Sequence, residues 1–177
     1  MIKVSLVRFT WELKQLPAAE PKMAHPMVLR LAKPDEDEMV WTTLERSLMS
    51  DPSWTMGLKN RLEELGQIVE KGFSDKQIEF LVLEDGNRFI GVSGLSTDAE
   101  QRQLVTGIHI LNEYRCRGAG SYLLHASLKN LKEKGLGQAS VVTRANVAAS
   151  RFLYPKFSSK KENLSEAPPI AVLSKSK

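Results

Sequence analysis

Seven consecutive residues constrain this chain most, because they place two glycines between an apolar segment and an amphipathic one. The run is Arg115-Cys116-Arg117-Gly118-Ala119-Gly120-Ser121. Residues 104–111 before it are apolar enough for a central strand, and residues 119–134 after it have the periodicity of a helix. The buried face of that helix carries Leu124, Leu128 and Leu131. A strand, a tight turn and a helix in direct succession predict an α/β fold.

This run, called the glycine loop below (residues 115–121), has the properties of an anion site. Glycine lets the backbone turn tightly and approach a ligand with no side chain in the way. The first amides of a helix have no partner within it, and the helix dipole adds partial positive charge there. Arg115 and Arg117 can add side-chain charge. Such a site suits a pyrophosphate, although the sequence patterns of dinucleotide-binding and Walker loops are both absent.

The chain here resembles the GNAT superfamily of acyl-CoA-dependent N-acyltransferases. The family's loop is Arg/Gln-x-x-Gly-x-Gly/Ala at the end of a central strand, and Arg115, Gly118 and Gly120 match it. The family continues with a helix, a strand and a short helix that starts at an Asn and ends near a Tyr. The corresponding segments here are 119–134, 139–144 and Asn146–Tyr154. The resemblance covers residues 78–157 closely and residues 27–77 in outline.

The resemblance implies acetyl-CoA as cosubstrate and no metal. It implies that backbone groups on the central strand pair with the pantetheine arm, that the glycine loop binds the pyrophosphate, and that an Asn side chain holds the arm. These cofactor-binding positions are Ile108, His109, Ile110, Arg115, Cys116, Arg117, Gly118, Ala119, Gly120, Ser121 and Asn146. In such enzymes an amine attacks the thioester directly in a ternary complex. A Tyr then protonates the leaving thiolate, and Tyr154 is the candidate here.

Two departures from the family pattern bear on catalysis. The spacing from Asn146 to Tyr154 is one residue longer than usual, so that Leu153 falls in the Tyr position if Asn146 anchors the match. Tyr154 is therefore either the general acid or a packing residue. The family's usual base positions on the central strand hold Leu104 and Thr106, and neither side chain is a base.

Three ways to provide a neutral, reactive amine stay open. Asp98 or Glu100 in the preceding loop could act through water, or the amine could arrive neutral. His109 is a third candidate, but strand alternation turns it to the face opposite Ile108 and Ile110, which favours a packed histidine. Trp54 follows a short loop, which makes it the candidate for the acceptor site that binds the amine.

Periodicity and turn residues predict the remaining elements. We expect strands at residues 27–32, 78–83, 89–95, 104–111, 139–144 and 170–173, and helices at residues 34–49, 57–71, 119–134 and 147–154. Residues 35–38 are all acidic, which favours the first turn of a helix over a metal site. Residues 1–26 hold a short apolar stretch and three prolines, and form an arm, an extra edge strand or a disordered leader.

The predicted fold is a single α/β (α+β) domain with a mixed central sheet of about six to seven strands and helices on both faces. After the N-terminal segment 1–26, residues 27–177 form the acetyltransferase domain. Within it we expect an acceptor-side half at 27–103, an acetyl-CoA-binding core at 104–157 and a C-terminal strand region at 158–177. The 177 residues are 42% hydrophobic, which suffices for one core.

Composition narrows the partners. The net charge of +4 comes without a concentrated basic stripe, so we expect no nucleic acid. No apolar run is long enough to span a membrane and no signal peptide is evident, so we expect a cytoplasmic monomer or homodimer. A single cysteine excludes an internal disulfide. The sequence thus predicts an N-acetyltransferase for a small-molecule or peptide amine, or alternatively a non-catalytic acyl-CoA-binding sensor or partner domain.

Overall fold

The computed structural model describes residues 5–23, 26–97, 102–170 and 173, and their strands form two antiparallel sheets. One sheet has the order β2-β3-β4-β5, with β2 at Val28–Leu31, β3 at Glu79–Asp85, β4 at Arg88–Leu95 and β5 at Leu104–Ile110. The other has the order β6-β1-β7, with β6 at Gln138–Arg144, β1 at Leu6–Glu12 and β7 at Lys160–Leu164. The predicted number of strands is thus confirmed, but they divide between two sheets.

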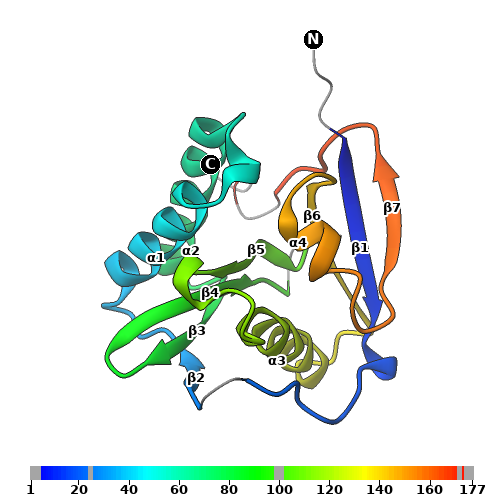
Figure 1. Cartoon of the computed structure of the whole chain (residues 1–177), viewed down its shortest axis with the longest axis horizontal. Coiled ribbons are helices and arrows are strands. Elements are labelled where there is room, and N and C mark those ends of the chain that lie inside the picture. The colour runs from blue at the N-terminus through cyan, green and yellow to red at the C-terminus, as the bar shows by residue number, and fades with distance from the viewer. Residues whose placement is uncertain (1–4, 24–25, 98–101, 171–172, 174–177) are drawn as a thin grey trace.

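The helices cover both faces of the four-stranded sheet, as predicted (Figure 1). They are α1 (Asp37–Met49), α2 (Leu58–Asp75), α3 (Ala119–Glu133) and α4 (Ala148–Phe152). The side chains of α3 share one core with Leu104 and Ile108 of β5, whereas α1 and α2 share another core with Val105 of the same strand. Strand β5 therefore separates the two cores and has helices on each side.

The N-terminal segment contributes the middle strand of the second sheet. Residues 6–12 pair antiparallel with β6 on one side and β7 on the other, so of the alternatives left open the segment forms an extra strand, although in the middle of its sheet and not at an edge. Val7, Phe9 and Trp11 alternate inward and are almost fully buried, as a half-buried strand requires. The prolines that suggested an edge lie beyond the strand, in the connection to β2.

The predicted last strand at 170–173 was also wrong. The strand is β7 at Lys160–Leu164, and Ile170 instead buries its side chain in the core under α1 and α2. Residues 171 and 172 lie outside the described part of the chain. No strand forms at residue 170 because Pro168 and Pro169, just before it, have no N–H to donate. Strand β7 was not predicted because it is an edge strand whose charged side chains are exposed, so it has no hydrophobic pattern.

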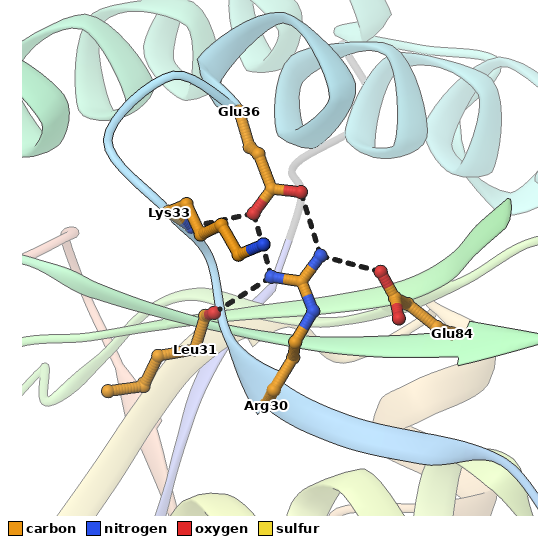
Figure 2. A network of polar contacts seen from close by, with 5 residues as sticks. All are labelled: Arg30, Leu31, Lys33, Glu36 and Glu84. Carbon is orange, nitrogen blue, oxygen red and sulfur yellow. Dashed lines mark hydrogen bonds and ion pairs between the residues drawn. The ribbon is translucent and has the colours of Figure 1, made fainter. Parts of the chain in front are cut away.

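Two helix boundaries differ from the prediction for identifiable reasons. Helix α1 begins at Asp37, because the Glu36 carboxylate accepts hydrogen bonds from both terminal nitrogens of Arg30 at 2.7 Å and from the Lys33 amide at 2.7 Å. Arg30 also bonds Glu84 at 2.6 Å, so one guanidinium joins β2, β3 and the start of α1 (Figure 2). The Arg30 hydrogen bonds lower the pKa of Glu36 to about 2.

Helix α2 runs past Gly72, which was predicted to end it. A Cβ at Gly72 would come 2.8 Å from the Phe80 ring, so the glycine serves a close approach of helix and strand. Among the described helices, none has the length and apolar character that crossing a bilayer demands.

Candidate active site

A cavity of about 450 Å³ follows β5 from the start of α3 to the layer of α1 and α2. Its first end, the loop end, is lined by Cys116, Gly118, Gly120, Ser121 and Lys156. Its second end, the helical end, is lined by Ser47, Asp51, Trp54 and Arg61. Between them lie Gly107, Ile108 and Tyr154, with Val141 and Thr143 of β6. The cavity therefore lies between β5 and β6, which are strands of different sheets.

At the loop end the glycine loop has the predicted backbone shape. Gly118 is the N-cap of α3 and has φ of +83°, a left-handed conformation that side chains disfavour. A Cβ there would also come 2.5 Å from the carbonyl oxygen of Lys22. Helix α3 begins at Ala119, so its unpaired first amides face the end of the cavity that Gly120 and Ser121 line.

The two arginines of the glycine loop do not have the predicted role of adding positive charge to the anion site. The Arg115 Nε donates to Ile110 O at 3.1 Å and its Nη2 donates to Ser47 O at 2.9 Å, so this side chain ties β5 to α1. Arg117 is exposed, and its guanidinium lies 5.8 Å from the Tyr114 ring centroid. The cation that reaches the helix start is Lys156, whose Nζ donates to Ser121 Oγ at 2.6 Å. No spacing rule in the sequence pointed to Lys156.

The other predicted cofactor positions fall in three environments. Ile108, His109 and Ile110 line the middle of the cavity, and exposed Cys116 lines its loop end with φ of +63°. Ala119 is buried in the core with 1% of its surface exposed. Asn146 is exposed in the turn before α4, outside the cavity that the described residues outline. The structure therefore gives no support to Asn146 as a ligand.

Tyr154 lies at the midpoint of the cavity despite its longer spacing. Its backbone N–H donates to Ala149 O at 2.8 Å, a wide turn that absorbs the additional residue after α4. Its hydroxyl accepts a hydrogen bond from the Ile108 N–H at 3.0 Å. Burial raises the pKa of the Tyr154 hydroxyl, which keeps it protonated at neutral pH. Leu153 also lines the cavity.

Gly107 makes this approach possible, and sequence reasoning missed it. It has φ of +73°, and a Cβ there would lie 2.8 Å from the Tyr154 hydroxyl. The pairing of β5 with β4 shifts register in this region, between Ser93 and Leu95. An isolated glycine in a strand is a known signal for such an irregularity, so Gly107 was open to detection.

His109 faces α1, on the side of β5 opposite the α3 core. Its Nε2 lies 2.8 Å from Thr106 O, and because a carbonyl only accepts, Nε2 carries the proton. Its Nδ1 faces Ser47 Oγ at 3.4 Å. Burial, followed by the charges of Arg61 and Arg115, lowers the pKa of His109 to about 4. The ring is neutral at pH 7. The other candidate bases, Asp98 and Glu100, lie outside the described residues.

The helical end holds two arginines that sequence reasoning did not single out. The guanidinium carbon of Arg144 lies 4.5 Å from the Trp54 ring centroid, and that of Arg61 lies 5.6 Å from it. Arg61 also donates to Thr106 O at 2.7 Å and pairs with Glu64. Trp54 is 9% exposed. No local pattern could join these residues, because they come from three separate segments.

The comparisons with known proteins agree with this geometry. A sequence model described as the acetyltransferase (GNAT) family matches residues 38–158. A search of curated protein sequences returns no match.

Among solved structures, a functionally unknown conserved protein from Staphylococcus epidermidis has a TM-score of 0.60 at 13% identity, over 91% of this chain. The chain spans only 59% of that protein's length. A GCN5-related N-acetyltransferase from Ralstonia eutropha has a TM-score of 0.60 at 17% identity, over 82% of this chain and 99% of the other. A predicted acetyltransferase from Clostridium acetobutylicum, solved with acetyl-CoA, has a TM-score of 0.58 at 12% identity, over 84% of this chain and 98% of the other.

Proposed function

This chain belongs to the GNAT family of acetyltransferases, and from that premise we propose that it transfers an acetyl group from acetyl-CoA to a primary amine. The observation that carries the proposal is the continuous cavity from the glycine loop, past the Tyr154 hydroxyl, to the helical end. It has one end with the properties of a phosphate site, one end for a second reactant, and a proton donor between them.

The loop end fits the phosphates of acetyl-CoA. Gly118 holds a conformation and a close contact that a side chain would disrupt, and the first amides of α3 are available as donors. Lys156 adds a positive charge beside Ser121. The similar fold from Clostridium acetobutylicum was solved with acetyl-CoA, which agrees with this assignment. By the family resemblance, Asn146 remains a candidate ligand only if the turn before α4 rearranges.

We propose that the residues of β5 and Tyr154 act on the reacting thioester. The Ile108 N–H now bonds the tyrosine hydroxyl, and backbone N–H groups in this strand region are suited to polarise a carbonyl oxygen. The amine lone pair forms the new C–N bond, and the C–S bond breaks. Tyr154 donates its proton to the leaving sulfur and regains a proton that the amine loses. Positioning the two reactants supplies much of the rate.

The base for the amine is a separate question. His109 is neutral and has its lone pair on Nδ1, but a pKa of about 4 makes it a weak base at pH 7. This observation favours an acceptor that binds as the neutral amine. It also supports the second candidate function, a non-catalytic acyl-CoA-binding domain, because the carboxylate in the described cavity lining, Asp51, lies at the helical end and bonds Ser53.

The cavity also supports the proposed division of the domain. Residues from 27–103 supply the helical end, and residues from 104–157 supply the loop end. We further propose a cytoplasmic monomer or homodimer, for which the single cysteine and the lack of a membrane-crossing helix among the described residues are compatible observations.

Steady-state thiol release from acetyl-CoA, measured with a panel of primary amines, tests the function. We expect release that depends on the amine and saturates with both reactants. Tertiary amines serve as controls, because they form no stable amide. If CoA binds in a calorimeter but no amine accelerates thiol release, the non-catalytic alternative is correct. If CoA does not bind, both candidates are wrong.

A further inference from the structure

We propose that the acceptor amine carries an anionic group, a carboxylate in its simplest form, which binds between Arg61 and Arg144 beside Trp54. The inference rests on the proposed function, since it assigns the substrate class of the same cavity. An amino acid is the smallest molecule with both groups.

The two guanidinium groups converge on one indole. Both guanidinium carbons lie within 5.6 Å of the Trp54 ring centroid, although Arg61 comes from α2 and Arg144 from the end of β6. Trp54 and Arg61 line the cavity, and so does Thr143, the residue before Arg144. A guanidinium over an aromatic ring can keep N–H groups available for a carboxylate, and Arg144 uses one terminal nitrogen for Met56 O.

The backbone at Gly57 is shaped to admit Arg144. Gly57 has φ of +75°, and a Cβ there would come 2.0 Å from the Arg144 Nη2. The Arg144 Nη1 donates to the carbonyl of Met56, the preceding residue. The loop before α2 thus fixes the position of this guanidinium relative to Trp54.

Arg61 and Arg144 have few direct counter-ions, because the carboxylate of Asp51, which also lines this end, accepts from Ser53 N and Oγ. Glu64 is the one described carboxylate within ion-pair distance of Arg61, and it is shared with Arg102 at 3.8 Å. No carboxylate in the described part of the chain lies that close to Arg144. Burial and the charge of Arg61 both lower the pKa of Arg144, as expected for cations that lack a sufficient counter-ion.

One donor of Arg61 is also unsatisfied. Its Nε is buried and has no hydrogen-bond partner among the described residues. Buried donors of a charged group without a partner are costly, so proteins seldom retain them without a reason. A bound anion would supply an acceptor and a negative charge where the described residues provide neither for this donor.

The side chain of Arg61 is bonded to the same strand that contacts the Tyr154 hydroxyl. Arg61 donates to Thr106 O at 2.7 Å, and Thr106 is two residues before Ile108, whose N–H bonds the Tyr154 hydroxyl. An amine near Tyr154 and a carboxylate beside Arg61 therefore fit within one small molecule. A simple amine without an anionic group leaves the two cations unneutralised.

The test compares common L-amino acids with their carboxamides, which keep the amine and lose the negative charge. In the thiol-release assay we expect the best amino acid to exceed its carboxamide in kcat/KM by tenfold or more, as for a charged hydrogen-bonded pair. Arg144→Gln removes that preference by raising the KM for the amino acid, whereas the KM for acetyl-CoA is unchanged. Arg144→Lys retains part of the preference, because it keeps the charge.

Arg88→Gln is the matched control, since Arg88 is exposed and lies outside this cavity. It is expected to leave the preference intact. Carboxamides used as well as amino acids, or a preference that survives in Arg144→Gln, would overturn the inference. If no amine is acetylated at all, calorimetric titration of CoA-saturated protein with the same pairs decides: tighter binding of the amino acids supports the inference, and equal or absent binding overturns it.

Discussion

The two ends of the cavity are built in different ways. The loop end consists of neighbouring residues in sequence, and its proposed donors are backbone amides at the start of α3. The helical end consists of side chains from α1, α2 and the segment between them, with Arg144 from the end of β6 against Trp54, and its character comes from the charges of Arg61 and Arg144. A site made of backbone amides keeps its binding groups when side chains are substituted. A site made of side chains changes its binding properties with each substitution. One end is therefore suited to a common cosubstrate and the other to an individual acceptor.

The largest expected effect tests whether the loop end depends on backbone shape alone. Gly118→Val introduces a Cβ that strains the left-handed backbone and meets the Lys22 carbonyl. We expect CoA affinity to fall tenfold or more, with up to about 3 kcal/mol lost through displaced charged hydrogen bonds. Calorimetric titration with CoA measures it.

Gly135→Val is the control for that variant. Gly135 follows the other end of the same helix with φ of +94°, and a Cβ there meets nothing within 4 Å. It carries the same kind of backbone strain and should leave CoA affinity unchanged. Wild-type affinity in Gly118→Val contradicts the assignment of the loop as the phosphate site.

A second variant tests whether charge governs the helical end. Burial, Arg61 and Arg115 hold the pKa of His109 at about 4, below the unfolded value of about 6.5. Between these values the unfolded chain binds a proton that the native state does not, so stability falls as the pH falls. When the pH is lowered from 7 to 5, we expect the free energy of unfolding to fall by about 2 kcal/mol more in the wild-type protein than in His109→Gln.

Urea unfolding of both proteins at the two pH values measures this difference. Gln keeps a donor for the Thr106 carbonyl, so the comparison concerns titration and not a lost hydrogen bond. Identical pH dependence of the two proteins would show that His109 is free to take up a proton in the native state.

The third effect concerns the junction of the two ends. Tyr154→Phe removes the hydroxyl and keeps the ring that packs against Phe9 and Trp11. We expect turnover to fall at least tenfold, about 1.4 kcal/mol, while CoA affinity is unchanged. Tyr122→Phe on α3 is the matched control and should keep full turnover. Equal turnover in Tyr154→Phe contradicts the role of the hydroxyl as general acid and leaves Tyr154 a packing residue.

The smallest effect probes the one exposed thiol at the loop end. Cys116 is the single cysteine and lines the cavity. We expect saturating CoA to slow its alkylation by iodoacetamide severalfold, because bound phosphates cover the loop. Gly118→Val labelled under the same conditions should lose this protection. An unchanged rate in the wild-type protein would place the thiol outside the covered surface.

The sequence predicted the loop end better than the helical end, for a physical reason. The left-handed Gly118 and the helix after it follow from local backbone preferences, which neighbouring residues reveal. Trp54 and Arg144 meet only because the segment before α2 lies beside the end of β6, and no local pattern reports such a contact. Thus Trp54 was identified as a candidate from its loop, while its cationic neighbours were not.

The fold shows the same distinction. Strands with a hydrophobic face, such as β3 and β4, were located within one or two residues. Strand β7 was missed because most of its side chains are charged or polar and exposed, which leaves no hydrophobic alternation to detect. Tyr154 illustrates a third case: a spacing rule placed Leu153 at the site, and a wide turn after α4 compensates for the additional residue.

The position of β1 between β6 and β7 has a consequence for synthesis of the protein. Strand β1 leaves the ribosome well before its partner strands, which begin at Gln138 and Lys160, and before α3, which shares its core and begins at Ala119. Until those residues emerge, Val7, Phe9 and Trp11 have no native surface to cover them. Closing so long a loop is a slow step. We therefore expect the nascent chain to depend on chaperones that shield β1, and to complete this sheet only after β7 has emerged.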